Sequence, residues 1–371
     1  MKVLVTGGAG FVGSHTADAL LAKGHQVRVF DNLEPQVHGA EAGIPAYLSK
    51  EVEFIKGDVR DRAALHKALS GMDAVFHLAA MVGVGQSMYD IIRYVEVNSL
   101  GGAVLLDILA NEKHTIQKVV VASSMSIYGE GQYHCRHCGV VHPKLRHEAQ
   151  LESRDWEMHC PKCGMTVTPQ PTNEEKPLFP TSIYAISKRD HEEMFLATGL
   201  AYNIPTVALR YFNIYGSRQA LSNPYTGVAA IFSSRLLNHK PPLVFEDGLQ
   251  SRDFIHVSDI VQANMLVFES EEADYQVFNV GTGRKLTIMD VGNILSEKLD
   301  PEQTPQILNQ FRAGDIRHCY SDINKISKLG YTPKVRFEDG MDELVEWVRE
   351  QQAEDLVEKA RAQLVERKLV K

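Results

Sequence analysis

The sequence predicts an α/β fold: a Rossmann-type, doubly wound parallel sheet with a smaller C-terminal lobe for a substrate and an inserted zinc ribbon. Three observations support this prediction. Short Val-rich segments alternate with helical stretches through about the first two hundred residues, the first segment runs into a glycine-rich turn, and two Cys-x2-Cys pairs interrupt the later pattern. Repeated strand–helix–strand units build a parallel sheet, and strands covered on both faces are largely apolar.

Short, apolar, Val-rich segments mark the buried strands, which we predict over residues 2–6, 26–30, 52–55, 74–78, 118–123 and 205–210. Residues 12–24 have a helical pattern that ends at Gly24, a residue type that often terminates helices. After Tyr211 the pattern loosens into proline-rich turns, which predicts a smaller and less regular lobe. Residues 256–270 are predicted to form a helix that returns to the first domain.

The C-terminal tail, from about residue 342 to residue 371, is predicted to be helical and is highly charged. A narrow apolar stripe on it, interpreted as a packing face, contains Leu356, Ala360, Leu364 and Val365.

Composition excludes several classes of protein. The formal charge of −8 argues against a nucleic-acid binder, which needs a clustered basic face. No apolar run approaches the roughly 20 residues that cross a bilayer, so no membrane partner is expected. The first residues run from a short strand straight into glycines, unlike a signal peptide. We therefore expect a cytoplasmic protein.

The first strand is followed by a turn in which Gly7, Gly10 and Gly13 are spaced three apart, and a helix begins there. Such a turn lets the backbone approach a pyrophosphate, and the helix N-terminus offers free N–H groups and a positive dipole end. Asp31 ends the second strand, where a carboxylate bonds the adenosine ribose and repels a 2′-phosphate. Glycines also simply make turns, but this context predicts a dinucleotide site and favours NAD over NADP.

Tyr184 and Lys188 are four residues apart in a helix that begins after Pro180, so they share one helix face. A phenol has a pKa of about 10 and is a poor base at neutral pH unless positive charge lowers that value. Lys188, beside a cationic nicotinamide, supplies such charge. Ser124 ends a predicted strand, where the ligand crevice of a doubly wound sheet lies. A Tyr–Lys pair also occurs on ordinary surface helices, and Ser124 favours the catalytic interpretation.

Eight motifs follow one another along the chain: TGGAGFVG (6–13), Asp31-Asn32, GDVRD (57–61), HLAA (77–80), SSMSIYG (123–129), YAISK (184–188), RYFNIYG (210–216) and RDFIHVSD (252–259). Together they resemble the extended short-chain dehydrogenase/reductases, the NAD-dependent epimerase/dehydratase family of nucleotide sugars. The resemblance extends from residue 1 to about residue 350 and is broken by one insertion. It implies that Ser124, Tyr184 and Lys188 are the catalytic trio.

The resemblance also implies binding roles. Asn98 is expected to support the loop and the helix beneath it, and Asn213, Arg252 and Arg312 to hold the diphosphate and a uridine- or thymidine-like nucleotide, since an Arg fork suits a diphosphate. Cys319 falls where galactose epimerases place a residue that lines the sugar pocket, although a buried thiol is also common. The substrate-binding residues predicted are Ser124, Met125, Ser126, Tyr184, Asn213, Arg252, Arg312, Asp315 and Cys319.

The predicted NAD contacts gather at the ends of the strands. Asp58 and Val59 are placed to touch the adenine, although a solvated loop acid would leave the same sequence pattern. The predicted set is Gly7, Gly10, Phe11, Val12, Gly13, Asp31, Asn32, Asp58, Val59, Leu78, Ala79, Ala80, Asn98, Ser123, Tyr184 and Lys188.

The residues after Ser124 distinguish between the reactions of the family. Its 4,6-dehydratases carry an adjacent Asp-Glu pair there, and its decarboxylases a Glu nearby. This sequence has Met125 and Ser126, which cannot serve as a carboxylate acid or base. The resemblance therefore implies a nucleotide-sugar 4-epimerase, and the stretches 82–89, 123–131 and 314–319 look most like dTDP-L-rhamnose 4-epimerases. A UDP-glucose- or UDP-glucuronate-type 4-epimerase, or a reductase or dehydratase of the family, remains the alternative.

The insertion contains Cys135-x2-Cys138 and Cys160-x2-Cys163, and a glycine follows each second cysteine. Those are the features of zinc-ribbon knuckles, in which four thiolates make a closed tetrahedral site. A redox pair is the lesser interpretation, because one disulfide does not need two symmetrical knuckles. We predict one structural zinc and expect the insertion to form a lid or a partner surface near the sugar pocket.

The predicted domains follow from these assignments. They are a NAD-binding Rossmann domain (1–132 and 172–212, with 253–275 returning to it), a zinc-ribbon insertion (133–171), a nucleotide-sugar-binding lobe (213–252 and 276–350) and a helical tail (351–371).

Two other functions compete with the epimerase: a dehydrogenase that releases its keto product, and a dinucleotide sensor whose zinc ribbon recruits a partner. The intact trio argues against the sensor. The resemblance implies a homodimer in which the helices 98–111 and 184–199 form a four-helix interface.

Overall fold

A seven-stranded parallel sheet with the strand order β14-β9-β5-β4-β1-β2-β3 forms the centre of the protein. The computed structural model describes residues 1–39, 43–351 and 353–371. The strands of this sheet are β1 (Lys2–Thr6), β2 (Gln26–Asp31), β3 (Glu53–Lys56), β4 (Ala74–His77), β5 (Lys118–Ser124), β9 (Thr206–Tyr211) and β14 (Val277–Val280). The predicted Rossmann-type parallel sheet is therefore confirmed.

The edge strand β14 is the one strand of this sheet that the sequence does not predict, since the predicted domains place residues 276–350 in the second lobe. Val277–Val280 pairs in parallel with β9, after the helix α10 (Val257–Glu269) returns to the sheet. A four-residue strand that contains a polar residue, Asn279, is too short for its pattern to predict it. Asn279 is fully buried and accepts a hydrogen bond from the Tyr128 hydroxyl at 2.7 Å.

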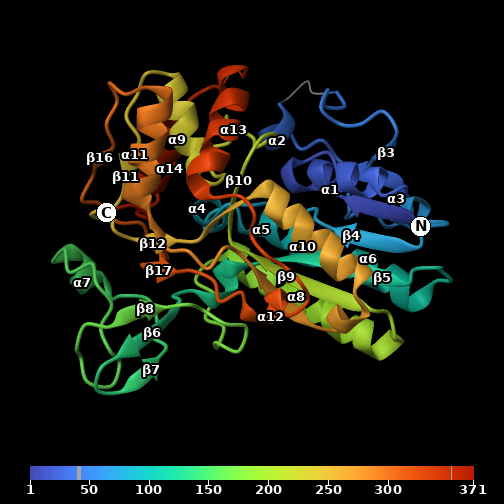
Figure 1. Cartoon of the computed structure of the whole chain (residues 1–371), viewed down its shortest axis with the longest axis horizontal. Helices are drawn as coiled ribbons and strands as arrows, with labels where there is room; N and C mark the ends of the chain where they lie inside the picture. Colours follow the sequence, from blue (N-terminus) through green and yellow to red (C-terminus); the bar gives the residue numbers. More distant parts are fainter. Residues whose placement is uncertain (40–42, 352) are drawn as a thin grey trace.

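Helices cover both faces of the sheet (Figure 1). Val3 and Val5 of β1 pack in one cluster with α1 (Phe11–Ala22) and α10, whereas Leu4 packs in a second cluster. The second cluster lies under α3 (Arg62–Leu69), α6 (Gly101–Asn111) and α8 (Ile183–Tyr202). Side chains alternate between the two faces of a strand, so the continuous apolar sequence of β1 follows from burial on both faces.

The second lobe has its own core, which contains Tyr215, Phe232, Phe254, Leu295 and Leu344. Its elements are α9 (Val228–Leu237), α11 (Ile288–Leu299), α13 (Phe337–Arg349), α14 (Val357–Glu366), β10 (Asn213–Tyr215), β11 (Leu243–Val244), β12 (Ser251–Arg252), β13 (Phe254–His256), β15 (Leu286–Thr287), β16 (Gln306–Ile307) and β17 (His318–Cys319). Shorter helices complete the fold: α2 (Pro35–His38), α4 (Val84–Ser87), α5 (Ile91–Tyr94), η1 (Val95–Leu100), η2 (Met125–Tyr128), η3 (Glu271–Ala273) and α12 (Asn324–Ser327).

The insertion folds as a small antiparallel sheet of β6 (Gln132–Cys135), β7 (Gly139–Val141) and β8 (Thr168–Gln170), with the short helix α7 (Glu148–Glu152). Figure 1 shows it at the lower left, against the second lobe. Its buried side chains are Tyr133, Cys135, Val141, Met158, Cys160 and Val167.

The tail is not the continuous helix that the sequence predicted. Helix α13 ends at Arg349, and α14 begins at Val357. After α14 the chain pairs with residues 311–313 through backbone hydrogen bonds between Phe311 and Lys371. Of the predicted apolar stripe, Ala360 and Leu364 are buried, but Val365 is 47% exposed. None of the helices that the structure describes combines the length and the apolar character that a bilayer span requires.

Candidate active site

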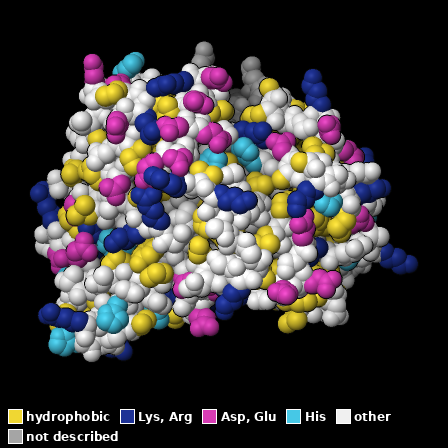
Figure 2. Space-filling view, viewed as in Figure 1, with side chains coloured by type: hydrophobic (Ala, Val, Ile, Leu, Met, Phe, Trp, Pro, Cys, Tyr) yellow, Lys and Arg dark blue, Asp and Glu magenta, His cyan; other side chains and the backbone are white. Residues whose placement is uncertain are grey.

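A cavity of about 620 Å³ lies at the carboxyl ends of β1 and β4 and extends into the second lobe. The strand order reverses between these two strands, because β2 and β3 lie beyond β1 while β5 and β9 lie beyond β4. Ligands of open α/β sheets bind at such a switch point. Acidic and basic side chains are intermixed on the face shown in Figure 2, whereas the cavity is lined by Arg235, Arg252, Arg312 and Arg361. These arginines suit an anionic ligand.

The glycine-rich turn forms one end of the cavity. Gly7 has φ 67°, and a Cβ on it would lie 2.8 Å from the backbone of Ala79. A Cβ on Gly13 would lie 2.2 Å from the Gly7 carbonyl oxygen. Helix α1 begins after Gly10 without a side-chain cap, which leaves its first N–H groups available. A dinucleotide pyrophosphate fits this cradle.

Asp31, at the end of β2, is fixed beside this turn. One of its carboxylate oxygens accepts a hydrogen bond from the Ala9 amide at 3.0 Å, and the other accepts one from the Leu33 amide at 2.8 Å. The side chain is buried and lines the cavity. Each carboxylate oxygen retains capacity for a further hydrogen bond, as ribose hydroxyls require.

Asp58 also lines the cavity, together with Asn32 and Val59. It accepts hydrogen bonds from the Arg60 guanidinium at 2.8 and 2.9 Å and from the Asn32 amide at 3.2 Å. The hydrogen bond from Arg60 lowers the pKa of the Asp58 carboxyl to about 2. Asp58 is therefore an ionised group whose position is set by two neighbours.

Ser124, Tyr184 and Lys188 all line the cavity, and the Tyr184 and Ser124 side chains share a hydrogen bond. Ser124 ends β5, and its hydroxyl oxygen accepts hydrogen bonds from the Ser126 amide at 3.2 Å and the Ser126 hydroxyl at 2.9 Å. Tyr184 lies in the first turn of α8, whose N-cap is Ser182. Lys188 is one turn further on the same face and donates to the Ala122 carbonyl at 2.9 Å. Strand β5 and helix α8 thus bring the three predicted catalytic groups together.

Burial perturbs the pKa values of both ionisable groups in this trio. It raises the pKa of the Tyr184 phenol, and the hydrogen bond with Ser124 opposes that rise. Burial lowers the pKa of the Lys188 ammonium to about 7. Perturbed groups of this kind, in contact with a cavity, are typical of general acid–base sites.

Two buried contacts hold α8 against the rest of the site. The Asn98 side chain accepts from the Met81 amide at 2.8 Å and donates to the Ser187 hydroxyl at 2.9 Å, so it joins the loop after β4 to the turn of α8 between Tyr184 and Lys188. Glu192, one turn after Lys188, accepts from the Ser123 hydroxyl at 2.7 Å. Asn98 therefore positions its neighbours without lining the cavity, whereas Ser123, Leu78, Ala79 and Ala80 line the cavity directly.

Met125 and Ser126 line the cavity directly after Ser124. The carboxylates among the described lining residues are Asp31, Glu34, Asp58 and Asp315. The first three border the glycine-turn end of the cavity, and Asp315 accepts from Arg312 Nε at 2.7 Å. The position beside the Ser124 hydroxyl therefore lacks a carboxylate in the described structure.

The far end of the cavity is built by the second lobe. The side-chain oxygen of Asn213 is buried there without a hydrogen-bond partner among the described residues. Arg252 donates to the carbonyls of Ile316 and Arg317 at 2.7 and 2.9 Å. Arg312 lies over the Phe245 ring, 4.6 Å from its centroid. Asn213, Arg252, Arg312 and Asp315 all line the cavity, and their predicted role in substrate binding stays a prediction.

Cys319 does not line the cavity, so this prediction is corrected. The parallel pairing of β17 with β12 directs Cys319 into a cluster with Met125, Tyr128, Phe212 and Ile316, where it is 1% exposed. Burial raises the pKa of its thiol to about 12. Cys319 supports the wall formed by Met125 and Ile316.

Sequence reasoning missed several lining residues. Gln219 and Gln250 are buried, line the cavity and have side-chain oxygens without partners among the described residues. Isolated glutamines carry no motif that would have revealed them. Val357, Ala360, Arg361 and Leu364 of α14 also line the cavity. The apolar stripe of the tail was the available signal, and we had interpreted it only as packing.

The four paired cysteines converge within the insertion. Their sulfur atoms all lie within 4.8 Å of one another, and Cys135 Sγ is 3.5 Å from Cys163 Sγ. Gly139 and Gly164, which follow the second cysteine of each pair, have φ 71° and φ 75°. Backbone amides of each turn point at the sulfur of its first cysteine. This cluster has the geometry of two facing knuckles.

Residues 3–144 and 163–281 match the NAD dependent epimerase/dehydratase family, and the gap in the match lies in the insertion. The chain is 34% identical, over 94% of its length and 95% of the relative, to dTDP-L-rhamnose 4-epimerase of Burkholderia thailandensis. Among solved structures, it resembles UDP-glucose 4-epimerase of Thermus thermophilus in complex with NAD (30% identity, TM-score 0.74, 95% and 100% of the two chains).

It also resembles UDP-N-acetylglucosamine 4-epimerase of Methanobrevibacter ruminantium in complex with UDP-N-acetylmuramic acid (32% identity, TM-score 0.75, 95% and 99% of the two chains). These likenesses span both the sheet and the second lobe. The chain belongs to the NAD dependent epimerase/dehydratase family.

Proposed function

We propose that the protein is an NAD-dependent nucleotide-sugar 4-epimerase, in which the Rossmann domain holds NAD and the second lobe holds the nucleotide diphosphate. The observation that carries this proposal is the composition of the cavity around Ser124. Ser124, Tyr184 and Lys188 supply the groups for oxidation of a sugar hydroxyl, while Met125 and Ser126 stand beside them in place of carboxylates. The relatives described above bear the names of nucleotide-sugar 4-epimerases.

Gly7, Gly13 and Asp31 would hold NAD, which would supply a reversible hydride acceptor beside the sugar. Tyr184 removes the proton of the sugar 4-hydroxyl and afterwards gives it back. Ser124 donates a hydrogen bond at the same oxygen, and the Lys188 ammonium stabilises the tyrosinate. The arginines of the second lobe hold the diphosphate. The 4-keto sugar can therefore rotate and present its opposite face while the diphosphate remains bound.

A dehydration is less consistent with the cavity than an epimerisation. Elimination of water requires an additional acid and base next to the sugar, and the described residues place no carboxylate beside Ser124. Return of the hydride to the opposite face of the same sugar needs only the trio. This argument favours epimerisation over dehydration, and the dehydrogenase alternative is distinguished by whether turnover consumes added NAD.

The proposed substrate is dTDP-L-rhamnose, with UDP-glucose or UDP-glucuronate as the alternative. The similarity to the Burkholderia thailandensis protein supports the first, and the solved UDP-sugar epimerases support the second. The purified enzyme should be incubated with dTDP-, UDP- and GDP-sugars, and the products analysed by NMR. Conversion of a dTDP- or UDP-sugar to its 4-epimer is the expected result, and no epimer from any of them would contradict the proposal.

We also propose that Cys135, Cys138, Cys160 and Cys163 bind one structural zinc ion. Zn–S bonds of about 2.3 Å place tetrahedral sulfurs about 3.8 Å apart, which is close to the spacing of this cluster. Amides aimed at sulfur favour thiolates, the form that binds metal. Four thiolates leave no open coordination position, so the ion has no part in the chemistry.

A homodimer is the proposed assembly. Ile91, Ile92, Val95 and Leu100 are 44–74% exposed on α5 and η1, and Ile186 is 44% exposed on α8. A group of five exposed apolar side chains on neighbouring helices is typical of a protein interface. A two-fold axis beside it would pair η1–α6 and α8 with the same helices of a second copy, which is the four-helix arrangement expected from the sequence.

A further inference from the structure

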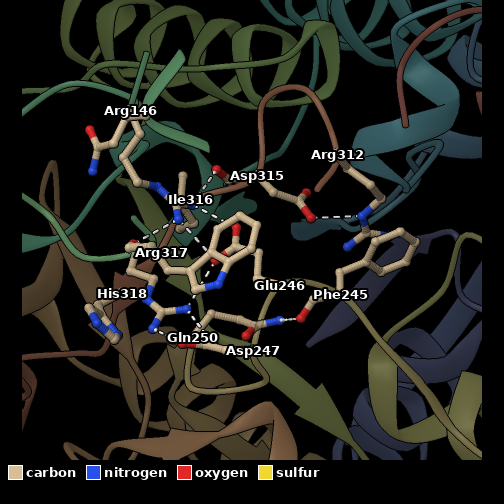
Figure 3. Close-up of polar contacts among 12 residues, drawn as sticks. Arg146, Phe245, Glu246, Asp247, Gln250, Arg312, Asp315, Ile316, Arg317 and His318 are labelled. Atoms are coloured by element: carbon tan, nitrogen blue, oxygen red, sulfur yellow. Dashed lines mark hydrogen bonds and ion pairs between the residues drawn. The ribbon is translucent and has the colours of Figure 1, made fainter. Parts of the chain in front are cut away.

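The insertion joins the second lobe through a cluster of five charged residues, of which Figure 3 labels Arg146, Glu246, Asp247 and Arg317; the side chains of Arg146, Glu246 and Arg317 are buried, and those of Asp247 and Glu157 are partly exposed. We call it the Glu246 cluster; its members are Arg146, Glu157, Glu246, Asp247 and Arg317. Two of them, Arg146 and Glu157, belong to the insertion. The other three belong to the two chain segments that wall the far end of the cavity.

Arg146 is 1% exposed and forms a bidentate ion pair with Glu246, whose carboxylate oxygens accept from its Nη1 and Nη2 at 2.9 and 2.8 Å. The same guanidinium donates to the Trp156 carbonyl at 2.9 Å and to the Asp315 carbonyl at 3.4 Å. A planar guanidinium fixes its partners in distance and in orientation. Arg146 therefore connects the insertion to both wall segments.

Arg317 is the second cation of the cluster, and its side chain is fully buried. It donates to Glu157 at 2.6 Å, to Glu246 at 3.0 Å and to Asp247 at 2.6 and 2.9 Å. Glu157 is three residues before Cys160, and its neighbour Met158 accepts from the Val167 amide at 3.0 Å inside the insertion. The fold of the four-cysteine module thus determines where Glu157 stands.

The cluster lies directly behind the cavity wall. Phe245 and Ile316 line the cavity, and they precede Glu246 and Arg317 in the chain. The Glu246 backbone has φ 52°, a conformation that residues other than glycine seldom adopt, and its amide donates to the Gln310 carbonyl at 2.8 Å. This strained turn presents the Phe245 ring to Arg312. A displacement of Glu246 or Arg317 therefore moves residues that face the ligand.

The charges of the cluster depend on the insertion, which supplies Arg146, one of the two cations. Glu246 is 3% exposed, and without Arg146 it would share Arg317 with Asp247 and Glu157. Removal of one partner from a buried ion pair leaves an incompletely neutralised charge, which is strongly unfavourable. The loop that carries Glu246 would then relax toward solvent and lose the geometry of the wall.

We propose that the insertion is a positioning element for the nucleotide end of the cavity, and that Arg146 and Glu157 are its positioning residues. This inference rests on the proposed function, because it assigns that end of the cavity to the nucleotide diphosphate. It replaces the expected lid: residues 133–171 are all described, and none of them lines the cavity. The insertion supports the wall from behind.

The test compares Arg146→Met with Arg146→Lys and Glu157→Gln. Arg154→Met and Glu152→Gln are the matched controls, because both residues are exposed on the same insertion. KM and kcat are measured with the nucleotide sugar that the wild type converts, and Kd for dTDP and UDP by calorimetry. Amide hydrogen exchange of residues 243–250 and 312–317 is followed in the absence of any ligand.

For Arg146→Met we expect KM and the nucleoside diphosphate Kd to rise roughly tenfold, with kcat changed by less than about twofold, as loss of uniform binding predicts. Exchange at 243–250 and 312–317 should accelerate, while exchange in β1, β4 and β5 stays at the wild-type rate. Arg146→Lys should recover part of the affinity, Glu157→Gln should show a smaller change of the same kind, and both controls should match the wild type.

Unchanged affinity and unchanged exchange in a folded Arg146→Met enzyme would overturn the proposal, and so would a fall in kcat with KM unchanged. The exchange measurement needs no substrate. A wild type that converts no nucleotide sugar would therefore contradict the proposed function, while the exchange result would still decide whether Arg146 positions these two segments.

Discussion

Lys188 Nζ donates a hydrogen bond to the Ala122 carbonyl at 2.9 Å, which fixes the lysine beneath the strand end that carries Ser124. Helix α8 places Tyr184 one turn away on the same face. The proposed base Tyr184, its hydroxyl partner Ser124 and the positive charge proposed to activate the base are therefore positioned by one strand and one helix. The following predictions test this arrangement and the elements around it.

Replacement of Tyr184 by Phe removes only the transferable proton. We expect kcat to fall by about 10²–10⁴-fold, the range for general acid–base groups, while substrate still binds. Ser124→Ala should lose less, because the phenol remains. The measurement is steady-state kinetics together with the Kd of the nucleotide sugar. Wild-type turnover in Tyr184→Phe would show that the active site lies elsewhere.

Lys188→Met removes the positive charge beside Tyr184. Burial raises the pKa of the Tyr184 phenol, so the tyrosinate becomes scarcer at a given pH once that charge is lost. The acid limb of the kcat–pH profile should move to higher pH by about one unit or more. An acid limb at the wild-type position would contradict the role of Lys188.

The pKa of Lys188, about 7 in the folded protein, also affects stability. The unfolded chain binds a proton at Lys188 up to its ordinary pKa of about 10.4, so between these values the unfolded state binds more protons. This group therefore makes the protein less stable as the pH falls from about 10 to 7. Lys188→Met should flatten the dependence of unfolding free energy on pH in that window, measured by urea denaturation. An unchanged slope would count against a buried Lys188.

The four-cysteine cluster predicts about one zinc per chain in protein purified without chelator. The double variant Cys160→Ser, Cys163→Ser should lose the metal and melt at a lower temperature, since binding energy contributes to the folding of such modules. His159→Gln, a change beside the knuckle at a residue that pairs with Asp155, is the control and should keep the metal. Metal analysis below about half a zinc per wild-type chain would reject the site.

Because helix α14 lines the cavity, we predict that the tail contributes to substrate binding. Leu364 is 6% exposed and lines the cavity, and the Gln363 side chain accepts from Tyr225 at 2.9 Å and from Tyr89 at 3.1 Å. Leu364→Asp should raise KM with little change in the NAD content of the purified enzyme. Val365→Asp, at the exposed neighbour, is the matched control. Equal KM values in the two variants would refute this role.

A structural feature could be predicted from the sequence when the residues that form it are close together along the chain. The Rossmann sheet, the glycine turn and the pairing of Tyr184 with Lys188 follow from local patterns, because strands and helices have their own periodicities. The Cys-x2-Cys pairs likewise predicted a cluster. In each case the residues that act together are close in sequence or carry a fixed spacing.

Contacts between distant segments escaped prediction. Cys319 was placed in the sugar pocket, but the pairing of β17 with β12 turns it into the protein. Arg146 and Glu246 are separated by 100 residues, and neither lies in a motif. The return of the tail to residues 311–313 depends on backbone pairing that no side-chain pattern records.

The central claim is that the hydride leaves C4 and returns to the same sugar. The most direct measurement is turnover of a nucleotide sugar labelled with deuterium at C4, by enzyme as purified and without added NAD, followed by NMR and by absorbance at the NADH band. We predict that the 4-epimer forms with its deuterium retained at C4 and that no NADH accumulates. Stoichiometric NADH together with a released keto sugar, or loss of the C4 deuterium to solvent, would contradict the account.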